Sequence, residues 1–128
     1  NYNINFVSAN FAITKANTST TVTSSKPTCL IIALLLGCKV TFTAYVAPVP
    51  PLSLSGLSGP TGTVTFYDGK AKLGTGTLSS SGTASVRTCP ITVIIYAIFC
   101  KHTITAVYSG DSNFNPSTSP ALNEMIPW

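Results

Sequence analysis

In His102-Thr-Ile-Thr-Ala-Val-Tyr108, apolar side chains alternate with hydroxyl-bearing ones. The alternation places Ile104, Ala106 and Tyr108 on one face of an extended chain, and a hydroxyl-lined face around Val107 on the other. This is the pattern of a β-strand that buries one face in a core. We therefore expect this stretch to be a central strand, and we read the rest of the chain outward from it.

The same period of two recurs along the chain. In the run 39–46, Val40, Phe42, Ala44 and Val46 share one face. Further strands are expected at 18–25, 62–67, 72–78, 83–86 and 118–126, with turns at Asp68-Gly69, Ser81-Gly82 and Gly110-Asp111 and a proline-rich loop at 47–60. The Gly-punctuated run 72–78 is typical of an edge strand. About seven short, evenly spaced strands predict an all-β sandwich.

The composition indicates one extracellular domain. Charged residues are only 8% of the 128 residues, against roughly 25% in an average globular chain. Serine and threonine supply the polarity, as on the outer faces of strands. The net charge of +4 comes from basic residues that stand singly in the sequence, so no basic stripe indicates nucleic-acid binding. No apolar run approaches the roughly 20 residues of a membrane span. The lack of an initiator Met or signal peptide indicates a processed, excised or engineered chain.

Three stretches resemble one family: Gly62-Thr-Val-Thr-Phe-Tyr-Asp-Gly69, Leu73-Gly-Thr-Gly-Thr-Leu78 and His102-Thr-Ile-Thr-Ala-Val-Tyr-Ser-Gly-Asp-Ser-Asn-Phe114. They are similar to the bacterial Ig-like repeat of the group 3 type, over Thr18 to about Met125. The resemblance implies an antiparallel Greek-key sandwich of about seven strands. It also implies a tandem module of secreted adhesins and cell-surface proteins.

Residues 1–17 lie outside this resemblance. They read as an extra N-terminal strand or hairpin, with Ile4 and Phe6 on one face and Phe11 and Ile13 on another. They resemble the terminal strands of a β-rich repeat that often precedes the Ig-like one. We expect residues 18–128 to form the sandwich and residues 1–17 an appendage whose four apolar residues are candidates for strand donation to a neighbour.

Two cysteine-closed stretches, Cys29–Cys38 and Cys89–Cys100, depart from the family pattern. They hold every cysteine and no charged residue between the cysteines. Because sandwich connections alternate between two poles, we expect both stretches to project from the same pole. Their apolar residues are the candidate partner-binding set: Leu30, Ile31, Ile32, Leu34, Leu35, Leu36, Ile91, Val93, Ile94, Ile95, Tyr96, Ile98 and Phe99.

Disulfides are expected at these cysteines. Closure of each stretch by its own pair is favoured, at about 2–3 kcal/mol per loop in the chain-entropy model, but pairing between the stretches stays open. A second interpretation is that the apolar runs cap the core or extend the sheets, since Val93 to Phe99 has strong β propensity. Against it, so many added apolar residues exceed what one pole can bury. The contact-surface interpretation is therefore preferred.

The sequence gives little support for a catalytic site or a metal-binding site. The only carboxylates are Asp68, Asp111 and Glu124, and the two aspartates fall in turns that favour local hydrogen bonds. The single histidine, His102, is expected to be structural or exposed. The cysteine spacing does not suit zinc, and three isolated carboxylates do not suit calcium. No enzyme activity, cofactor or metal is expected. Asn17-Thr18-Ser19 is a glycosylation sequon.

Two functions remain. The first is a structural and adhesive module, a fibre or adhesin subunit that self-associates or docks through the apolar stretches and its N-terminal strand. The alternative is a binding scaffold, natural or engineered, that presents two disulfide-closed loops to a protein target. Both have a protein partner and a secreted or cell-surface location.

Overall fold

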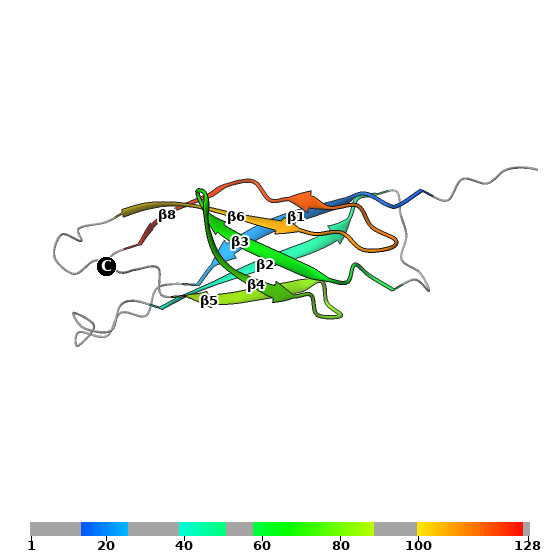
Figure 1. Ribbon diagram of the computed structural model, residues 1–128, viewed down its shortest axis with the longest axis horizontal. Helices are drawn as coiled ribbons and strands as arrows, with labels where there is room; N and C mark the ends of the chain where they lie inside the picture. Colours follow the sequence, from blue (N-terminus) through cyan, green and yellow to red (C-terminus); the bar gives the residue numbers. More distant parts are fainter. Residues whose placement is uncertain (1–13, 26–38, 51–57, 89–99, 127–128) are drawn as a thin grey trace, which may run out of the picture.

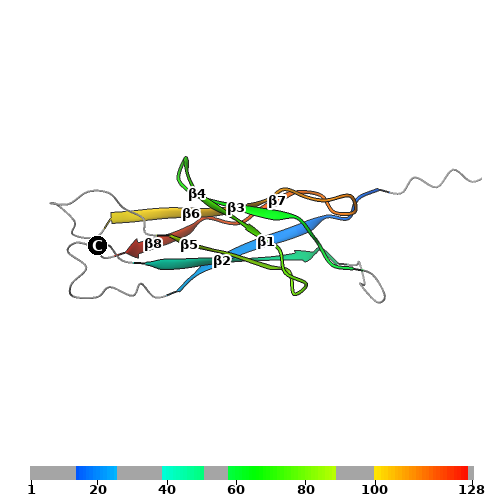
Figure 2. The ribbon, with the colours of Figure 1, turned by 60° about the horizontal axis from the view of Figure 1, so that its bottom comes forward.

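Two antiparallel sheets pack face to face in the computed structural model, which describes residues 14–25, 39–50, 58–88 and 100–126 (Figures 1 and 2). The first sheet has the order β1 (Thr18–Ser24), β2 (Val40–Pro48), β5 (Thr83–Thr88). The second has the order β4 (Ala71–Thr77), β3 (Thr63–Asp68), β6 (Cys100–Tyr108), β7 (Ser117–Thr118), and β8 (Leu122–Ile126) also pairs with β6. The expected all-β Ig-like sandwich is confirmed.

The core lies between the sheets and is built from the alternating positions of the central strands. Val40, Phe42, Ala44 and Val46 of β2 are buried, as the period-two pattern predicts. They face the buried apolar members of the second sheet, which are Val64, Phe66, Ile104, Ala106 and Tyr108. Burial, together with the nearby Asp111 carboxylate, raises the pKa of the Tyr108 phenol to about 12.

Strand β1 turns hydroxyl groups inward. Thr18 and Thr20 are buried beside Val22, and both contact Ser117 Oγ, at 2.8 and 2.7 Å respectively. Thr18 also donates to the Asn115 carbonyl at 2.8 Å. Because buried hydroxyls need partners, these bonds tie the edge of the first sheet to β7 in the second.

The strand β2 runs two residues further than expected. The sequence assigns Ala47 and Pro48 to a loop, but Ala47 pairs with Ser19 and Pro48 with Thr18. The directions of the neighbouring backbone N–H groups explain why a proline is tolerated at position 48. Val46 N donates to the Gly82 carbonyl beside β5, and Val49 N donates to the Asn17 carbonyl beside β1. The nitrogen of Pro48 points to the β5 side beyond the point where β5 has turned away, so no ladder bond is lost.

The last expected strand, 118–126, is broken into β7 and β8. Ser119 interrupts the ladder: its backbone N donates to the Ala106 carbonyl at 2.8 Å, while its side chain accepts from Ala106 N at 3.0 Å. Pro120 follows and has no N–H to offer. The side-chain hydroxyl therefore replaces one backbone acceptor, and pairing with β6 resumes at Leu122.

The chain enters and leaves the sandwich at opposite ends. Ala16 precedes β1 and bridges Phe114, with bonds to Asn113 and Asn115 at 2.8 Å each. Strand β8 ends at Ile126 at the other end of the body, beside the start of β6 (Figure 1). The strand-donation residues Ile4, Phe6, Phe11 and Ile13 lie outside the described residues.

Strand β4 forms the edge of the second sheet, as expected. The packing of β4 against β5 gives a further reason for its glycines. A Cβ at Gly76 would lie 2.8 Å from the Ser85 carbonyl oxygen, and one at Gly74 would lie 2.5 Å from a Val86 methyl. These glycines therefore permit β4 to approach the backbone of β5 and close the sandwich on that side.

We expect Gly76→Ala to lower the free energy of unfolding by about 1–3 kcal/mol, because the added methyl overlaps backbone atoms that cannot turn aside. Gly59→Ala is the control, since a Cβ there meets nothing within 4 Å. Urea unfolding of both variants measures the difference. Equal stability of the two would contradict a close β4–β5 approach.

Asp111 organises the end of the sandwich where the chain enters. Its Oδ1 accepts from the backbone N of Asn113 and Phe114, and its Oδ2 accepts from the backbone N and hydroxyl of Thr61, all at 2.8 Å. The expected turn role is confirmed and extends to a second loop. Although burial acts to raise it, these hydrogen bonds lower the pKa of Asp111 to about 2.

Asp111 has a lower pKa in the folded protein than in the unfolded chain. Such a carboxyl group stabilises the fold at pH values above its unfolded-state pKa, and this stabilisation is lost as the pH falls through its folded-state pKa. Asp111 therefore stabilises the domain above about pH 4 and stops doing so as the pH approaches about 2. We expect Asp111→Asn to lose about 1–2 kcal/mol at pH 7, a value discounted for solvent screening, and less at pH 2. Thermal unfolding across this range tests the convergence of the two proteins.

Candidate functional site

Both cysteine-closed stretches attach at one end of the sandwich. The first leaves β1 after Ser25, whose N donates to the Thr41 carbonyl at 2.8 Å, and re-enters at Lys39 before β2. The second leaves β5 at Thr88, which pairs with Val40, and re-enters at Cys100, which pairs with Ile126. We call this end, defined by Ser25, Lys39, Thr88 and Cys100, the loop pole (left in Figure 1).

A contact between the sheets brings these attachment points together. The hydroxyl of Ser24, at the end of β1, donates to Glu124 Oε1 on β8. Glu124 in turn pairs with His102 near the start of β6. The described strand ends thus agree with the expectation that both stretches project from the same pole.

The stretches themselves lie outside the described residues. This holds for Cys29, Cys38, Cys89, the side chain of Cys100, and all the candidate partner-binding residues from Leu30 to Leu36 and from Ile91 to Phe99. Disulfide closure, its connectivity and the partner-binding role stay predictions.

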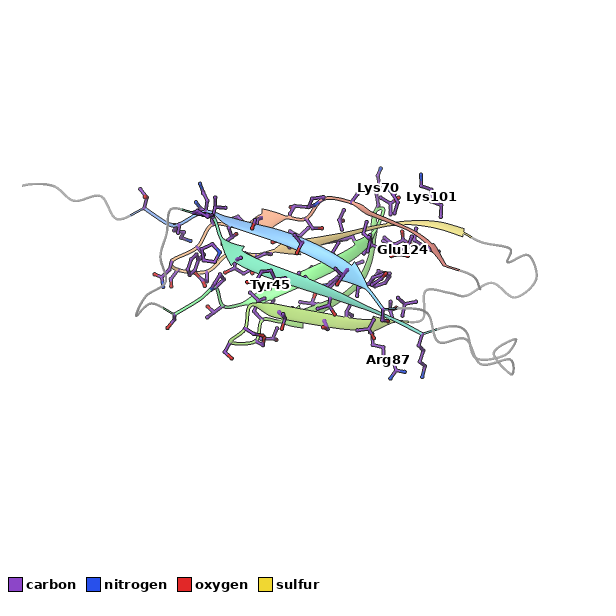
Figure 3. The ribbon with its side chains drawn as sticks, turned by 180° about the vertical axis from the view of Figure 1, so that it is seen from behind. Tyr45, Lys70, Arg87, Lys101 and Glu124 are labelled. Carbon is purple, nitrogen blue, oxygen red and sulfur yellow. The ribbon has the colours of Figure 1, made fainter. Side chains whose placement is uncertain are left out.

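Basic side chains gather at the loop pole, although they stand singly in the sequence. Lys39 and Arg87 lie beside the ends of β2 and β5, Lys101 follows the first residue of β6, and Lys70 lies in the β3–β4 turn. All four are exposed. Figure 3 shows Lys70, Arg87 and Lys101 at the same end of the body. We call these four residues the basic collar.

The collar is not evident in the sequence, because its basic residues stand far apart along the chain. The signal that could have found it is positional. Lys39, Arg87 and Lys101 each adjoin a cysteine-closed stretch, within two residues of Cys38, Cys89 and Cys100. Once both stretches are assigned to one pole, these residues must also meet there.

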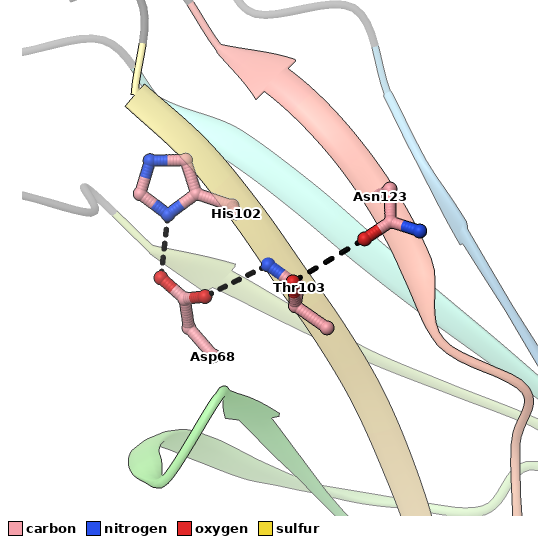
Figure 4. A network of polar contacts seen from close by, with 4 residues as sticks. All are labelled: Asp68, His102, Thr103 and Asn123. Carbon is pink, nitrogen blue, oxygen red and sulfur yellow. Dashed lines mark hydrogen bonds and ion pairs between the residues drawn. The ribbon is translucent and has the colours of Figure 1, made fainter.

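A polar network supports the start of β6 beneath the pole (Figure 4). Asp68 Oδ2 lies 2.5 Å from His102 Nδ1, and Asp68 Oδ1 accepts from the backbone N of Thr103 at 3.1 Å. The hydroxyl of Thr103 continues the network to Asn123 Oδ1 on β8 at 3.3 Å. His102 is buried, with 9% of its surface exposed.

The role expected for Asp68 is therefore corrected. Its carboxylate does not bond within its own turn but reaches across to β6, because the β3–β4 hairpin turns through Gly69 at a φ of 56° beside Thr103. Gly69 N donates to the Thr103 carbonyl at 2.9 Å. The hairpin is thus clamped to β6, and His102 has the structural role expected for it.

Within the described ranges, no three histidine, cysteine or carboxylate side chains converge on a point that could hold a metal ion. The same ranges contain no helix long and apolar enough to cross a membrane.

We expect Asp68→Ala to destabilise the domain by about 2–3 kcal/mol, because it removes the two hydrogen bonds that Asp68 makes with the buried His102 ring and with the Thr103 N–H. Asn123→Ala removes only the outer bond of the same network and should cost less than about 0.5 kcal/mol. Chemical denaturation gives both values. If the two variants were equally stable, Asp68 would not clamp the hairpin to β6.

Comparison with known proteins agrees with this architecture. The model of the family described as bacterial Ig-like domain (group 3) matches residues 7–126. No curated protein and no solved structure matches the chain. Members of this family are generally non-catalytic and typically occur in surface or secreted proteins. Since the match spans nearly the whole chain, the protein belongs to the bacterial Ig-like domain family of group 3.

Proposed function

We propose that the protein is a non-enzymatic structural and adhesive module of a secreted or cell-surface protein, and that it docks through its loop pole. One observation carries the proposal: the strand ends that hold both cysteine-closed stretches lie together at one end of the sandwich. Two uncharged, apolar insertions at one end provide a contact surface. The framework strands, which form the folded domain, are separate from these insertions.

Hydrogen bonds join the strand ends at the pole where it can be described. The Asp68 network fixes the start of β6, and the Ser24–Glu124 contact fixes β1 against β8. A contact surface on rigid strand ends loses less conformational entropy on binding than one on a free loop. Disulfide closure of each stretch would reduce that loss further.

The proposed partner is a protein, either an identical subunit or a separate target. Donation of the N-terminal strand is a second route to self-association. The bonds of Ala16 support it, because they hold the chain before β1 against the end opposite the loop pole. A subunit could then contact one neighbour at each end, as a fibre requires.

Replacing residues 29–38 and 89–99 by short Gly/Ser turns tests the proposal. We expect a folded domain with a cooperative thermal transition. The physical reason is that, in the part of the chain that the structure describes, every buried core residue except Phe114 lies in a framework strand. Light scattering should show that the unaltered chain associates and that this variant does not.

A second variant with only residues 1–13 removed separates the two contacts, since it keeps the loop pole and lacks the donor strand. If the replaced-loop variant failed to fold, the stretches would be part of the core and the proposal would be wrong. If the full-length chain and both variants were equally monomeric at high concentration, self-association would be excluded.

A further inference from the structure

We propose that the outer face of the first sheet binds an acidic polysaccharide, in which uncharged sugars separate the carboxylated ones. This inference goes beyond the proposed docking of the loop pole, because it uses a different surface that the structure describes throughout. We call this surface the hydroxyl face. It consists of the outward side chains of β1, β2 and β5 and of Lys39 before β2, namely Ser19, Thr21, Thr23, Lys39, Thr41, Thr43, Tyr45, Thr83, Ser85 and Arg87.

The strand register arranges these side chains in rows across the sheet. Two complete rows are Thr23, Thr43, Ser85 and Thr21, Tyr45, Thr83. Neighbours within a row stand about 5 Å apart and successive rows about 7 Å apart. Because the alternate residues of each strand face the core, every member of the two rows is exposed or partly exposed. The face therefore presents polar groups at regular intervals, as a chain of sugar rings does.

The hydroxyl groups of the face have capacity for further hydrogen bonds. Thr43 Oγ1 and Ser85 Oγ lie 3.0 Å apart, and the Thr23 hydroxyl donates to the Thr43 carbonyl at 3.3 Å. A hydroxyl group has one donor and two acceptor positions, so each of these groups can bond to one more polar group. Sugar hydroxyls have the same mixed character. The centre of the face thus matches the uncharged part of a polysaccharide.

Positive charge lies at one end of the hydroxyl face. Arg87 pairs directly with Thr41. Lys39 lies two residues before Thr41 and on the same side of β2, because Val40 between them is buried. Lys39 and Arg87 are therefore diagonal neighbours, and such positions on one face are about 7–8 Å apart, within reach of long side chains. A single anionic group can contact both cations.

These two cations have no acidic counterpart within the protein. The chain has three carboxylate side chains, and the structure describes all of them. Asp68 bonds to β6, Glu124 bonds to β1, and Asp111 joins two loops at the opposite end of the sandwich. Among the described residues, the one ion pair joins Asp68 to a histidine. The face is thus complementary in charge to a carboxylate, which a guanidinium binds through two parallel hydrogen bonds.

Tyr45 provides an exposed aromatic ring on the same face. Its side chain is 51% exposed, and a Cβ added at Gly82 would lie 3.6 Å from its Cε2 atom. The ring is therefore supported by the chain at Gly82 and still half open to solvent. Figure 3 shows Tyr45 over β2 and Arg87 at the end of β5. An aromatic ring packs against the C–H groups of a sugar ring, while the phenol bonds to polar groups.

The distribution of these groups favours a polysaccharide over a nucleic acid or a protein. A nucleic acid carries a phosphate at every nucleotide and is bound by a basic stripe, whereas this face has its cations at one end only. A protein-binding surface has an apolar centre, whereas threonine and serine form the centre of this face. An acidic polysaccharide uses the cations, the hydroxyl rows and the aromatic ring together.

Binding of the full chain to hyaluronate tests the proposal, since carboxylated and uncharged sugars alternate in this polymer. Affinity electrophoresis in gels that contain hyaluronate gives the Kd, and dextran is the uncharged reference. We expect hyaluronate binding that weakens as salt is added, and binding to dextran that is weaker by about tenfold or more. Arg87→Gln should weaken hyaluronate binding about tenfold, the size of one charge-assisted contact. Tyr45→Ala should weaken it about fivefold, and Tyr45→Phe should retain most of it.

A matched control distinguishes this face from the net charge of the protein. Lys101→Gln removes the same charge near the same end of the sandwich, but from the outer face of the second sheet, since the adjacent His102 is buried. It should leave hyaluronate binding unchanged. Arg87→Lys keeps the charge without the paired donors and should lose less affinity than Arg87→Gln. Thermal unfolding of every variant confirms that each is folded.

The proposal is overturned if the full chain does not bind hyaluronate, if it binds dextran equally well, or if Arg87→Gln and Lys101→Gln weaken binding to the same extent. Tighter binding to single-stranded DNA than to hyaluronate would also overturn it. Replacement of residues 29–38 and 89–99 separates this inference from the proposed function, because that variant should lose association and keep hyaluronate binding. If the folded variant lost hyaluronate binding, the site would lie at the loop pole and not on the hydroxyl face.

Discussion

The burial of alternating side chains between two sheets is the constraint on which the rest of the molecule depends. Phe42 from β2 and Phe66 and Tyr108 from the second sheet are fully buried, and each lies in a strand whose next residue faces solvent. Because side chains alternate with a period of two, this contact determines the orientation of every neighbour along β2, β3 and β6. It also aligns the strands, so that the ends of β1 and β5 and the starts of β2 and β6 come to one pole.

Polar contacts join segments that the apolar core has already brought together. The chain has few charges, and its three carboxylates all accept hydrogen bonds that join separate segments: Asp68 joins β3 to β6, Glu124 joins β8 to β1, and Asp111 joins two loops. Buried threonines of β1 make the same kind of junction with Ser117. The consequence for function is electrostatic. Since its acids are engaged in the framework, the basic residues that the structure describes at the loop pole have no carboxylate paired with them.

The pole combines two properties that arise from different levels of organisation. Its apolar insertions are a property of the sequence, whereas its basic collar is a property of the fold. From the first we infer the adhesive end proposed above; the second gives that end a positive charge. The chain enters at the opposite end through Ala16, so the proposed docking end and the entry point are separated by the length of the sandwich.

A period of two is a local property that each strand carries alone. The fold class, the strands around Phe42, Phe66 and Ile104 and their buried faces could therefore be predicted from the amino-acid sequence. It also determined the turn role of Asp111, which depends on neighbours two and three residues away. Only the tertiary structure decided the partners of Asp68, the break at Ser119, the tolerance of Pro48 within β2 and the convergence of Lys39, Lys70, Arg87 and Lys101. Each of these depends on register between segments distant in the chain, and register is set by packing across the sheets rather than by local pattern.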